Sequence, residues 1–198
     1  MENLIKRYPS LEQCKEDMQK ALKLMINTYK NGGKILVCGN GGSAADSDHI
    51  VGELMKGFVN KRPVTNEKIP QEMREFLQGA LPAISLSGQI ALFTAYSNDV
   101  SPDMVYAQMV FGYGKENDLL IALSTSGNSK NVVNAAKVAS SLGVRTIAFT
   151  GETGGTLSEI CNVSIKVPST ETYKVQEYHL PVYHYLCLET EKYFFDKK

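Results

Sequence analysis

A histidine and a glutamate stand four residues apart at His49 and Glu53, in a segment with helical apolar spacing. At that spacing an imidazole and a carboxylate share one helix face, where they can bind a metal ion or move protons. Most such pairs are surface ion pairs, so chemistry requires further groups. The other two histidines, His179 and His184, stand near the end of the chain. Gln176 lies two helical turns before His184 and is predicted to share its face.

Two turns rich in glycine and hydroxyl groups follow short apolar runs. The first is Gly39-Asn-Gly-Gly-Ser43, and the second is Ser124-Thr-Ser-Gly-Asn-Ser129. Glycine lets the backbone approach a ligand, and the amides of a following helix attract an anion. The first turn lacks the third glycine of a dinucleotide-binding loop, and no Gly-Lys-Ser/Thr follows it. Either turn alone is typical of a helix cap, but two at strand ends of one sheet predict a sugar-phosphate site.

Short apolar runs predict strands, apolar residues at helical spacing predict helices, and the two kinds of element alternate along the chain. Strands are expected at 35–38, 83–86, 119–123, 144–150 and 163–167, and helices at 11–29, 44–58, 87–95, 103–112, 130–142, 156–161 and 172–195. This alternation predicts an α/β three-layer sandwich, in which helices cover both faces of a parallel sheet of about five strands. Pro181 is expected to kink or break the last helix.

The chain is interpreted as a single domain over residues 1–198, because no linker interrupts it. Residues 1–31 form an N-terminal helical extension. The polar segment 60–79 contains two prolines and is predicted to be a surface excursion with a short helix. A solvated loop, a lid and an oligomer contact all remain open for it.

Composition excludes several functional classes. The 21 basic residues balance the 21 acidic ones, so we expect no nucleic-acid partner and no anionic-membrane partner. No apolar run is long enough to cross a bilayer, and the first residues lack the apolar core of a signal peptide. The four cysteines are scattered, which predicts reduced thiols and a cytoplasmic location. Cys14 lies among polar residues and is expected to be the more exposed thiol.

Four motifs in order resemble those of the SIS (sugar isomerase) domain: residues 38–53, 97–99, 123–129 and 176–184. Within this family they are similar to phosphoheptose isomerases, which interconvert sedoheptulose 7-phosphate and D-glycero-D-manno-heptose 7-phosphate. The resemblance implies a flavodoxin-like sheet, a phosphosugar substrate, a homotetramer and one Zn²⁺ per subunit.

The resemblance also implies roles for individual residues. Glu53 matches the base and His184 the acid of an aldose–ketose isomerisation through an enediol, a reaction that needs one of each. The implied zinc ligands are His49, Glu53, Gln176 and His184. The implied substrate contacts are Asn40, Gly41, Gly42, Glu53, Asn98, Asp99, Ser124, Thr125, Ser126, Ser129 and Gln176, of which the four hydroxyl residues hold the phosphate.

Two other functions remain open. One is a non-catalytic SIS adaptor similar to the DnaA-initiator-associating protein, and the other is a sensor that binds a phosphosugar without converting it. An adaptor needs helical surfaces but no acid/base pair, so Glu53, Gln176, His49 and His184 favour chemistry. Turnover of sedoheptulose 7-phosphate, with and without a chelator, separates the three.

Overall fold

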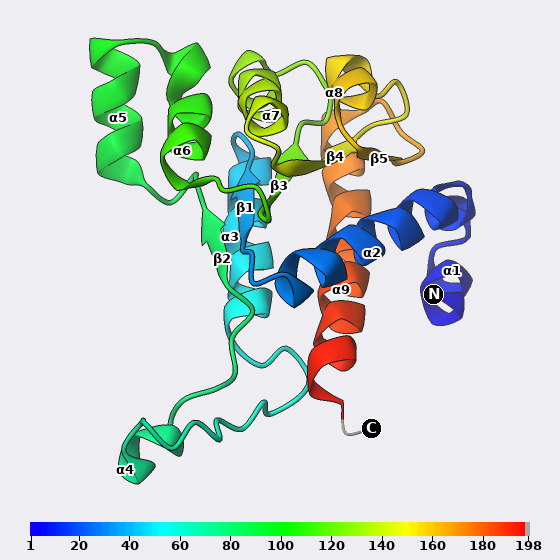
Figure 1. Ribbon diagram of the computed structural model, residues 1–198. Helices are drawn as coiled ribbons and strands as arrows, with labels where there is room; N and C mark the ends of the chain where they lie inside the picture. The colour runs from blue at the N-terminus through cyan, green and yellow to red at the C-terminus, as the bar shows by residue number, and fades with distance from the viewer. Residues whose placement is uncertain (197–198) are drawn as a thin grey trace.

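A five-stranded parallel sheet organises the computed structural model, which describes residues 1–196 (Figure 1). Its strands are β1 (Ile35–Cys38), β2 (Ala83–Ser85), β3 (Leu119–Leu123), β4 (Arg145–Thr150) and β5 (Val163–Lys166). They are ordered β2-β1-β3-β4-β5, and every neighbouring pair is parallel. In the register, Ile35 of β1 pairs with Ala83 and with Leu119. The predicted α/β class and parallel sheet are confirmed.

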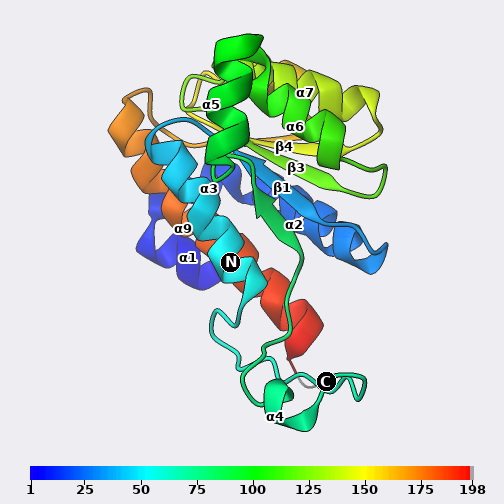
Figure 2. The same cartoon turned by 90° about the vertical axis from the view of Figure 1, so that its left-hand side faces the viewer.

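Helices cover both faces of the sheet, as Figure 2 shows from the side. The helices are α1 (Glu2–Arg7), α2 (Lys15–Lys30), α3 (Gly42–Met55), α4 (Gln71–Arg74), α5 (Ile90–Asp99), α6 (Val105–Tyr113), α7 (Lys130–Ser141), α8 (Gly155–Ile160) and α9 (Thr172–Phe195), with 3-10 turns at Pro9–Cys14 and Pro102–Met104. The helices α2, α3 and α9 pack on one face, and α6, α7 and α8 pack on the other. None of the helices within residues 1–196 is long and apolar enough to span a membrane.

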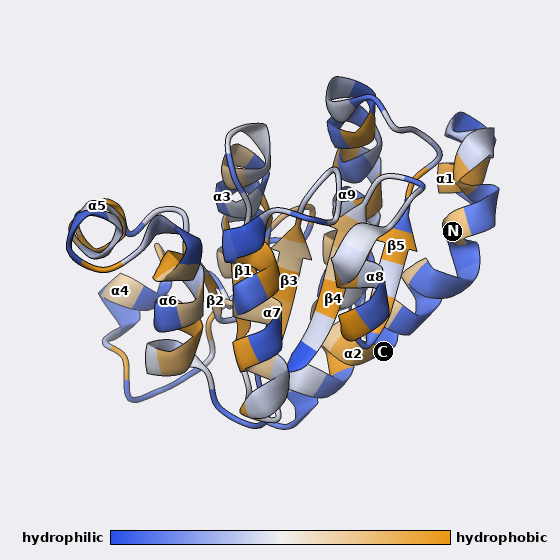
Figure 3. Cartoon of the chain, turned by 90° about the horizontal axis from the view of Figure 1, so that it is seen from above, coloured by the Kyte–Doolittle hydropathy of each residue, from blue (hydrophilic) through white to orange (hydrophobic). Residues whose placement is uncertain are grey.

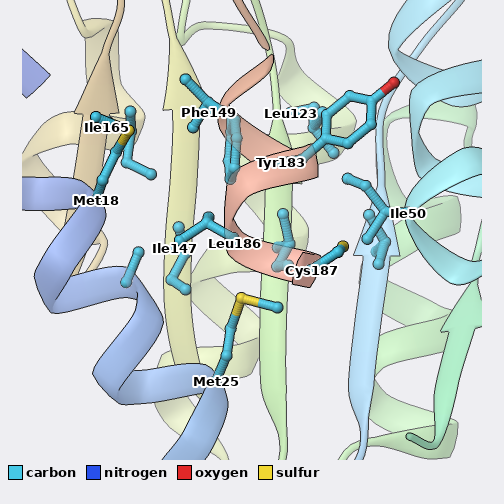
Figure 4. Close-up of a cluster of buried hydrophobic side chains, with 14 of the residues drawn as sticks. Met18, Met25, Ile50, Leu123, Ile147, Phe149, Ile165, Tyr183, Leu186 and Cys187 are labelled. Carbon is cyan, nitrogen blue, oxygen red and sulfur yellow. The ribbon is translucent and has the colours of Figure 1, made fainter. Parts of the chain in front are cut away.

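Alternating strand residues build one apolar core on each side of the sheet. In β1, Ile35 and Val37 belong to the core with α2, α3 and α9, while Leu36 and Cys38 belong to the core with α6 and α7. This alternation follows from the two-residue period of a strand. Figure 3 shows the largely hydrophobic strands between the helices, and Figure 4 shows part of the first core. That core fixes α3 and α9 over the same face.

Two local predictions are wrong, and of the kink or break expected at Pro181 the break does not occur. The last helix runs unbroken through Pro181. Proline has no N–H to donate to the Glu177 carbonyl, but Glu177 is exposed, so water can bond to that carbonyl instead. The helix expected from Ser87 begins at Ile90, because the Ser87 hydroxyl donates instead to the Gly39 carbonyl. Cys14 is only 1 % exposed, and its thiol donates to a backbone carbonyl of β5 at 3.1 Å.

The segment from residue 60 to residue 79 extends away from the sandwich in both views (Figures 1 and 2). It carries α4 and the 86 % exposed side chain of Phe76. The two ends of the segment are joined by a hydrogen bond from the backbone N–H of Gly79 to the Arg62 carbonyl at 2.7 Å. Arg62 is fully buried and pairs with Glu191 of α9 at 2.7 Å. The segment is therefore a surface excursion that is tied down at its two ends.

Candidate active site

Both glycine- and hydroxyl-rich turns lie at the point where the strand order reverses. The chain leaves β1 toward β2 on one side and leaves β3 toward β4 on the other, although β1 and β3 are neighbours. In open parallel sheets, ligands bind at the carboxyl ends of the strands beside such a point. The turns at 39–43 and 124–129 follow the carboxyl ends of these two strands. The sheet topology therefore brings two separate ligand-binding motifs to one edge.

The first turn is held by its own backbone and by α7. Gly41 precedes α3 with φ +55°, a conformation that favours glycine. The side-chain amides of Asn40 and Asn131 form a reciprocal pair of hydrogen bonds at 2.8 and 3.0 Å, which joins this turn to α7. The Gly39 carbonyl accepts the hydroxyl proton of Tyr106 at 2.5 Å. The two exposed glycines at 41 and 42 thus present a fixed backbone surface.

The second turn is an internally bonded cradle. Ser124 is buried and its hydroxyl donates to the Ser129 hydroxyl at 2.9 Å. The Asn128 amide donates to the Ser126 hydroxyl at 3.2 Å. A Cβ on Gly127 would lie 1.9 Å from the carbonyl oxygen of Gly154, so this turn packs directly against the loop after β4. Such a rigid loop at the start of α7 suits an anion.

Two helices bring the predicted acid/base groups together. His49 and Glu53 lie on α3, with 3.1 Å between Nε2 and Oε1. His184 lies on α9, and its Nε2 is 3.4 Å from Nε2 of His49 across 135 residues of sequence. Burial and the neighbouring His49 lower the pKa of His184, while Glu53 opposes that shift. The His184 ring is therefore biased toward its neutral form.

Tyr183 and Asp46 complete this cluster, and sequence reasoning missed both. The Tyr183 hydroxyl donates to Oδ1 of Asp46 at 3.1 Å and lies 3.0 Å from Nδ1 of His49. Burial, followed by the charge of Asp46, raises the pKa of Tyr183; burial also raises the pKa of Asp46. The three-residue spacing of Asp46 and His49 could have indicated a shared face. No comparable spacing pointed to Tyr183, because the motif that contains it was interpreted through the neighbouring His184.

The remaining predicted residues lie apart from this cluster. Gln176 covers the first turn, where a Cβ on Gly42 would lie 2.7 Å from its Oε1. No hydrogen bond among residues 1–196 joins Gln176 to the histidines. Asn98 and Asp99 end α5, are exposed, and bond to each other at 2.9 Å. Within the described chain these two residues make no bond to the cluster or the turns.

The histidine–glutamate cluster fits a metal ion in part. As the side chains of residues 1–196 stand, no group of three or more His, Cys, Asp or Glu is arranged to hold one. The separations of 3.1 and 3.4 Å from His49 to Glu53 and to His184 are nevertheless close to the edge of a zinc tetrahedron. That edge is roughly 3.3–3.4 Å for bonds of about 2.0–2.1 Å. An oxygen of Glu53 and a nitrogen of His184 therefore each lie about one such edge from Nε2 of His49.

An open cavity of about 870 Å³ borders His184. It is lined by residues of α1 and α9 and by Phe58, and the hydroxyls of the second turn do not reach it. A second cavity of about 610 Å³ lies at the opposite edge of the sheet and contains none of the predicted site residues. The larger cavity thus borders the proposed acid, His184, but its lining includes neither His49 nor Glu53 and does not reach the cradle.

A parallel sheet whose strand order reverses between two phosphate-type turns, with an acid/base cluster between two helices on one of its faces, defines a phosphosugar-binding α/β domain. The family model described as "SIS domain" matches residues 2–151. The chain belongs to the SIS domain family, in the branch of the phosphoheptose isomerases.

Three relatives place it there. A phosphoheptose isomerase of Aliarcobacter butzleri is 41 % identical over 177 residues, covering 89 % of this chain and 85 % of the relative. The structure of a phosphoheptose isomerase from Francisella tularensis aligns with a TM-score of 0.76 at 31 % identity, covering 96 % and 97 % of the two chains. That from Neisseria gonorrhoeae aligns with a TM-score of 0.73 at 32 % identity, covering 96 % and 98 %.

Proposed function

We propose that this chain is an aldose–ketose isomerase that converts sedoheptulose 7-phosphate to D-glycero-D-manno-heptose 7-phosphate. The observation that carries the proposal is the approach of His184 on α9 to His49 and Glu53 on α3. Relatives that share about two fifths of the sequence bear the name of this activity. The roles of the residues below are proposals of the same kind.

The reaction divides between two parts of the site. The hydroxyls of the turn at 124–129, with the amides at the start of α7, bind the phosphate and anchor the sugar. The Glu53 carboxylate takes the proton from the carbon beside the carbonyl, which produces an enediol. His184 exchanges a proton with the sugar oxygens, and its lowered pKa keeps a neutral ring available for this exchange. Return of the proton to the adjacent carbon completes the isomerisation.

The turn at 39–43 and Gln176 border the same edge and are proposed to contact the sugar. Asn98 and Asp99 are proposed as further sugar contacts. We also propose that His49, Glu53, Gln176 and His184 hold one zinc ion per subunit. Bound there, zinc would polarise the oxygens of the sugar. Gln176 must then turn from Gly42 toward the histidines.

A homotetramer in the cytoplasm is the proposed setting. Exposed apolar side chains on α5 and α6, among them Ile90 (73 % exposed) and Phe111 (66 % exposed), are candidates for subunit contacts. The open cavity beside His184 also leaves room for a neighbouring subunit to complete the site. Reduced thiols and phosphosugar substrates are typical of the cytoplasm. Light scattering of the purified protein tests the tetramer.

The deciding experiment follows aldose formation from sedoheptulose 7-phosphate by the wild-type chain and by Glu53→Gln. We expect Glu53→Gln to abolish turnover while phosphosugar binding survives, because the amide cannot accept the carbon-bound proton. Glu12→Gln changes an exposed carboxylate paired with Lys15 and serves as the control. Full activity in Glu53→Gln would reject Glu53 as the base.

The same assay separates the alternatives. Tight binding of the phosphosugar by the wild-type chain without turnover, before and after addition of Zn²⁺, would favour a sensor. Neither binding nor turnover would favour an adaptor. Loss of turnover with a chelator and recovery with Zn²⁺ would support the metal.

A further inference from the structure

The hydroxyl of Tyr183 lies between two polar side chains of α3. It donates to Oδ1 of Asp46 at 3.1 Å and is 3.0 Å from Nδ1 of His49. Tyr183 is 1 % exposed, and Figure 4 shows its oxygen pointing away from the apolar cluster that surrounds its ring. Asp46 and His49 are three residues apart, so both face α9 from one side of α3. The hydroxyl therefore joins the two helices that carry the proposed acid/base groups.

Proton accounting sets the direction of these hydrogen bonds. A carboxylate only accepts, and a phenol has a single proton to donate. Because that proton goes to Asp46, the Tyr183 oxygen must accept the second bond, and Nδ1 of His49 must supply its proton. The neutral ring then has its lone pair on Nε2. Nε2 is the atom that lies 3.1 Å from Glu53 and 3.4 Å from His184.

We propose that Tyr183 and Asp46 are positioning residues that hold His49 in its Nδ1–H form and present the Nε2 lone pair to Glu53 and His184. The inference rests on the proposed function for its effect on catalysis, but the position of the proton is measurable without it. Neither residue need touch the sugar.

The opposite order of hydrogen bonds is unfavourable. If Tyr183 donated to His49, the Asp46 carboxylate would face the phenol oxygen at 3.1 Å with no proton between them. His49 would then donate from Nε2 to Glu53 and occupy the carboxylate that is proposed to act as the base. The proposed order moves the unprotonated contact to Nε2 of His49 and Oε1 of Glu53, which lie 3.1 Å apart. There both lone pairs stay free to bind one cation, and the Glu53 carboxylate is not occupied by a donor. Partners of this kind commonly change metal affinity by roughly 10–100-fold when they are removed.

Three substitutions separate the effects of Tyr183 and Asp46 on the position of the His49 proton. Tyr183→Phe removes the hydroxyl but keeps the buried ring. Asp46→Asn keeps an accepting oxygen for Tyr183, whereas Asp46→Ala removes it and frees the phenol proton for Nδ1 of His49. Tyr178→Phe is the matched control, because it removes a hydroxyl of the same helix whose one partner within residues 1–196 is the exposed Ser10.

The first measurement is long-range proton–nitrogen NMR of the metal-free protein at about pH 8.5, where an ordinary histidine is neutral. The chain has three histidines, and His184→Gln and His179→Gln variants assign their signals. We expect His49 to be Nδ1–H in the wild type, Asp46→Asn and Tyr178→Phe, and Nε2–H in Asp46→Ala. An Nε2–H ring in the wild type, or an unchanged ring in Asp46→Ala, would overturn the proposal.

The second measurement is calorimetric titration with Zn²⁺ alone. We expect Tyr183→Phe to bind Zn²⁺ roughly 10–100-fold more weakly than the wild type, and Tyr178→Phe to bind it equally. Equal binding by Tyr183→Phe, or no binding by the wild type, would overturn the part that concerns metal. A wild-type chain in which His49 is Nδ1–H but which has no isomerase activity would refute the proposed function and leave this inference standing. An active chain in which His49 is Nε2–H would refute this inference and leave the proposed function standing.

Discussion

Replacement of Glu191 by glutamine tests whether the excursion is anchored through a buried ion pair. The Glu191 side chain is fully buried on α9. One of its oxygens accepts from the Arg62 Nε at 2.7 Å and from the Phe58 amide at 2.8 Å. The other accepts from the amides of Val59 and Asn60 at 2.9 and 3.2 Å. Glutamine has the same shape but puts a donor group where two of these four donors point.

The expected loss follows from these contacts. Breaking a buried ion pair by removing one charge costs about 3–5 kcal/mol. Arg62 keeps partners in the carbonyls of Leu54 at 2.7 Å and Glu53 at 3.1 Å, which favours the lower part of that range. Arg62 also has φ +47°, a strained conformation that depends on such contacts. We expect Glu191→Gln to lower the free energy of unfolding by about 3–4 kcal/mol.

Urea unfolding at fixed protein concentration, followed by circular dichroism, measures this loss. In a chain of this size it corresponds to a Tm lower by roughly 6–16 °C. Glu189→Gln is the matched control, because Glu189 is 29 % exposed and, within residues 1–196, its one ion pair is with Lys192 on the same helix. That substitution is expected to cost less than about 1 kcal/mol. A loss in Glu191→Gln no larger than in the control would refute the reasoning.

The pH dependence of the same variant gives a second check. Burial alone would raise the pKa of Glu191, but hydrogen bonds from Val59, Phe58, Arg62 and Asn60 outweigh it and lower the pKa. A carboxyl with a lowered folded-state pKa stabilises the protein above its ordinary pKa of about 4.3. This contribution disappears as the pH falls through the lowered value. The difference in stability between the wild type and Glu191→Gln is therefore expected to shrink below about pH 4.

Two further predictions concern single positions. Burial lowers the pKa of His179 from 6.5 to about 4, so its contribution to stability is complete above pH 6.5 and falls toward pH 4 by up to roughly 3 kcal/mol. Urea unfolding across that range is expected to show a weaker pH dependence in His179→Gln, and an identical profile would contradict the prediction. Gly127→Ala puts a Cβ 1.9 Å from the Gly154 oxygen at φ +68°. We expect kcat/KM for the phosphosugar to fall on the order of 100-fold, and an unchanged value would show that the cradle tolerates displacement.

Local patterns in the sequence were sufficient for the fold class and for the relationships within single elements. The continuous apolar runs of β1 and β3, with strands alternating with helices along the chain, predicted a buried parallel sheet, because helices cover both faces of such a sheet. The spacing of His49 and Glu53 predicted a shared face, because side chains four apart on a helix are neighbours. The two turns were visible because glycine and hydroxyl residues have distinct backbone and hydrogen-bonding roles.

Tertiary packing decided which of these groups meet. His184 approaches His49 only because α3 and α9 pack on the same face of the sheet. Arg62 stands in a polar segment typical of a solvated loop, yet it is buried against Glu191, a partner 129 residues away. The Tyr183 hydroxyl likewise meets two side chains of α3 only because α9 packs against that helix. Spacing along a chain determines neighbours within one helix or strand, whereas contacts between distant elements depend on how their apolar faces pack.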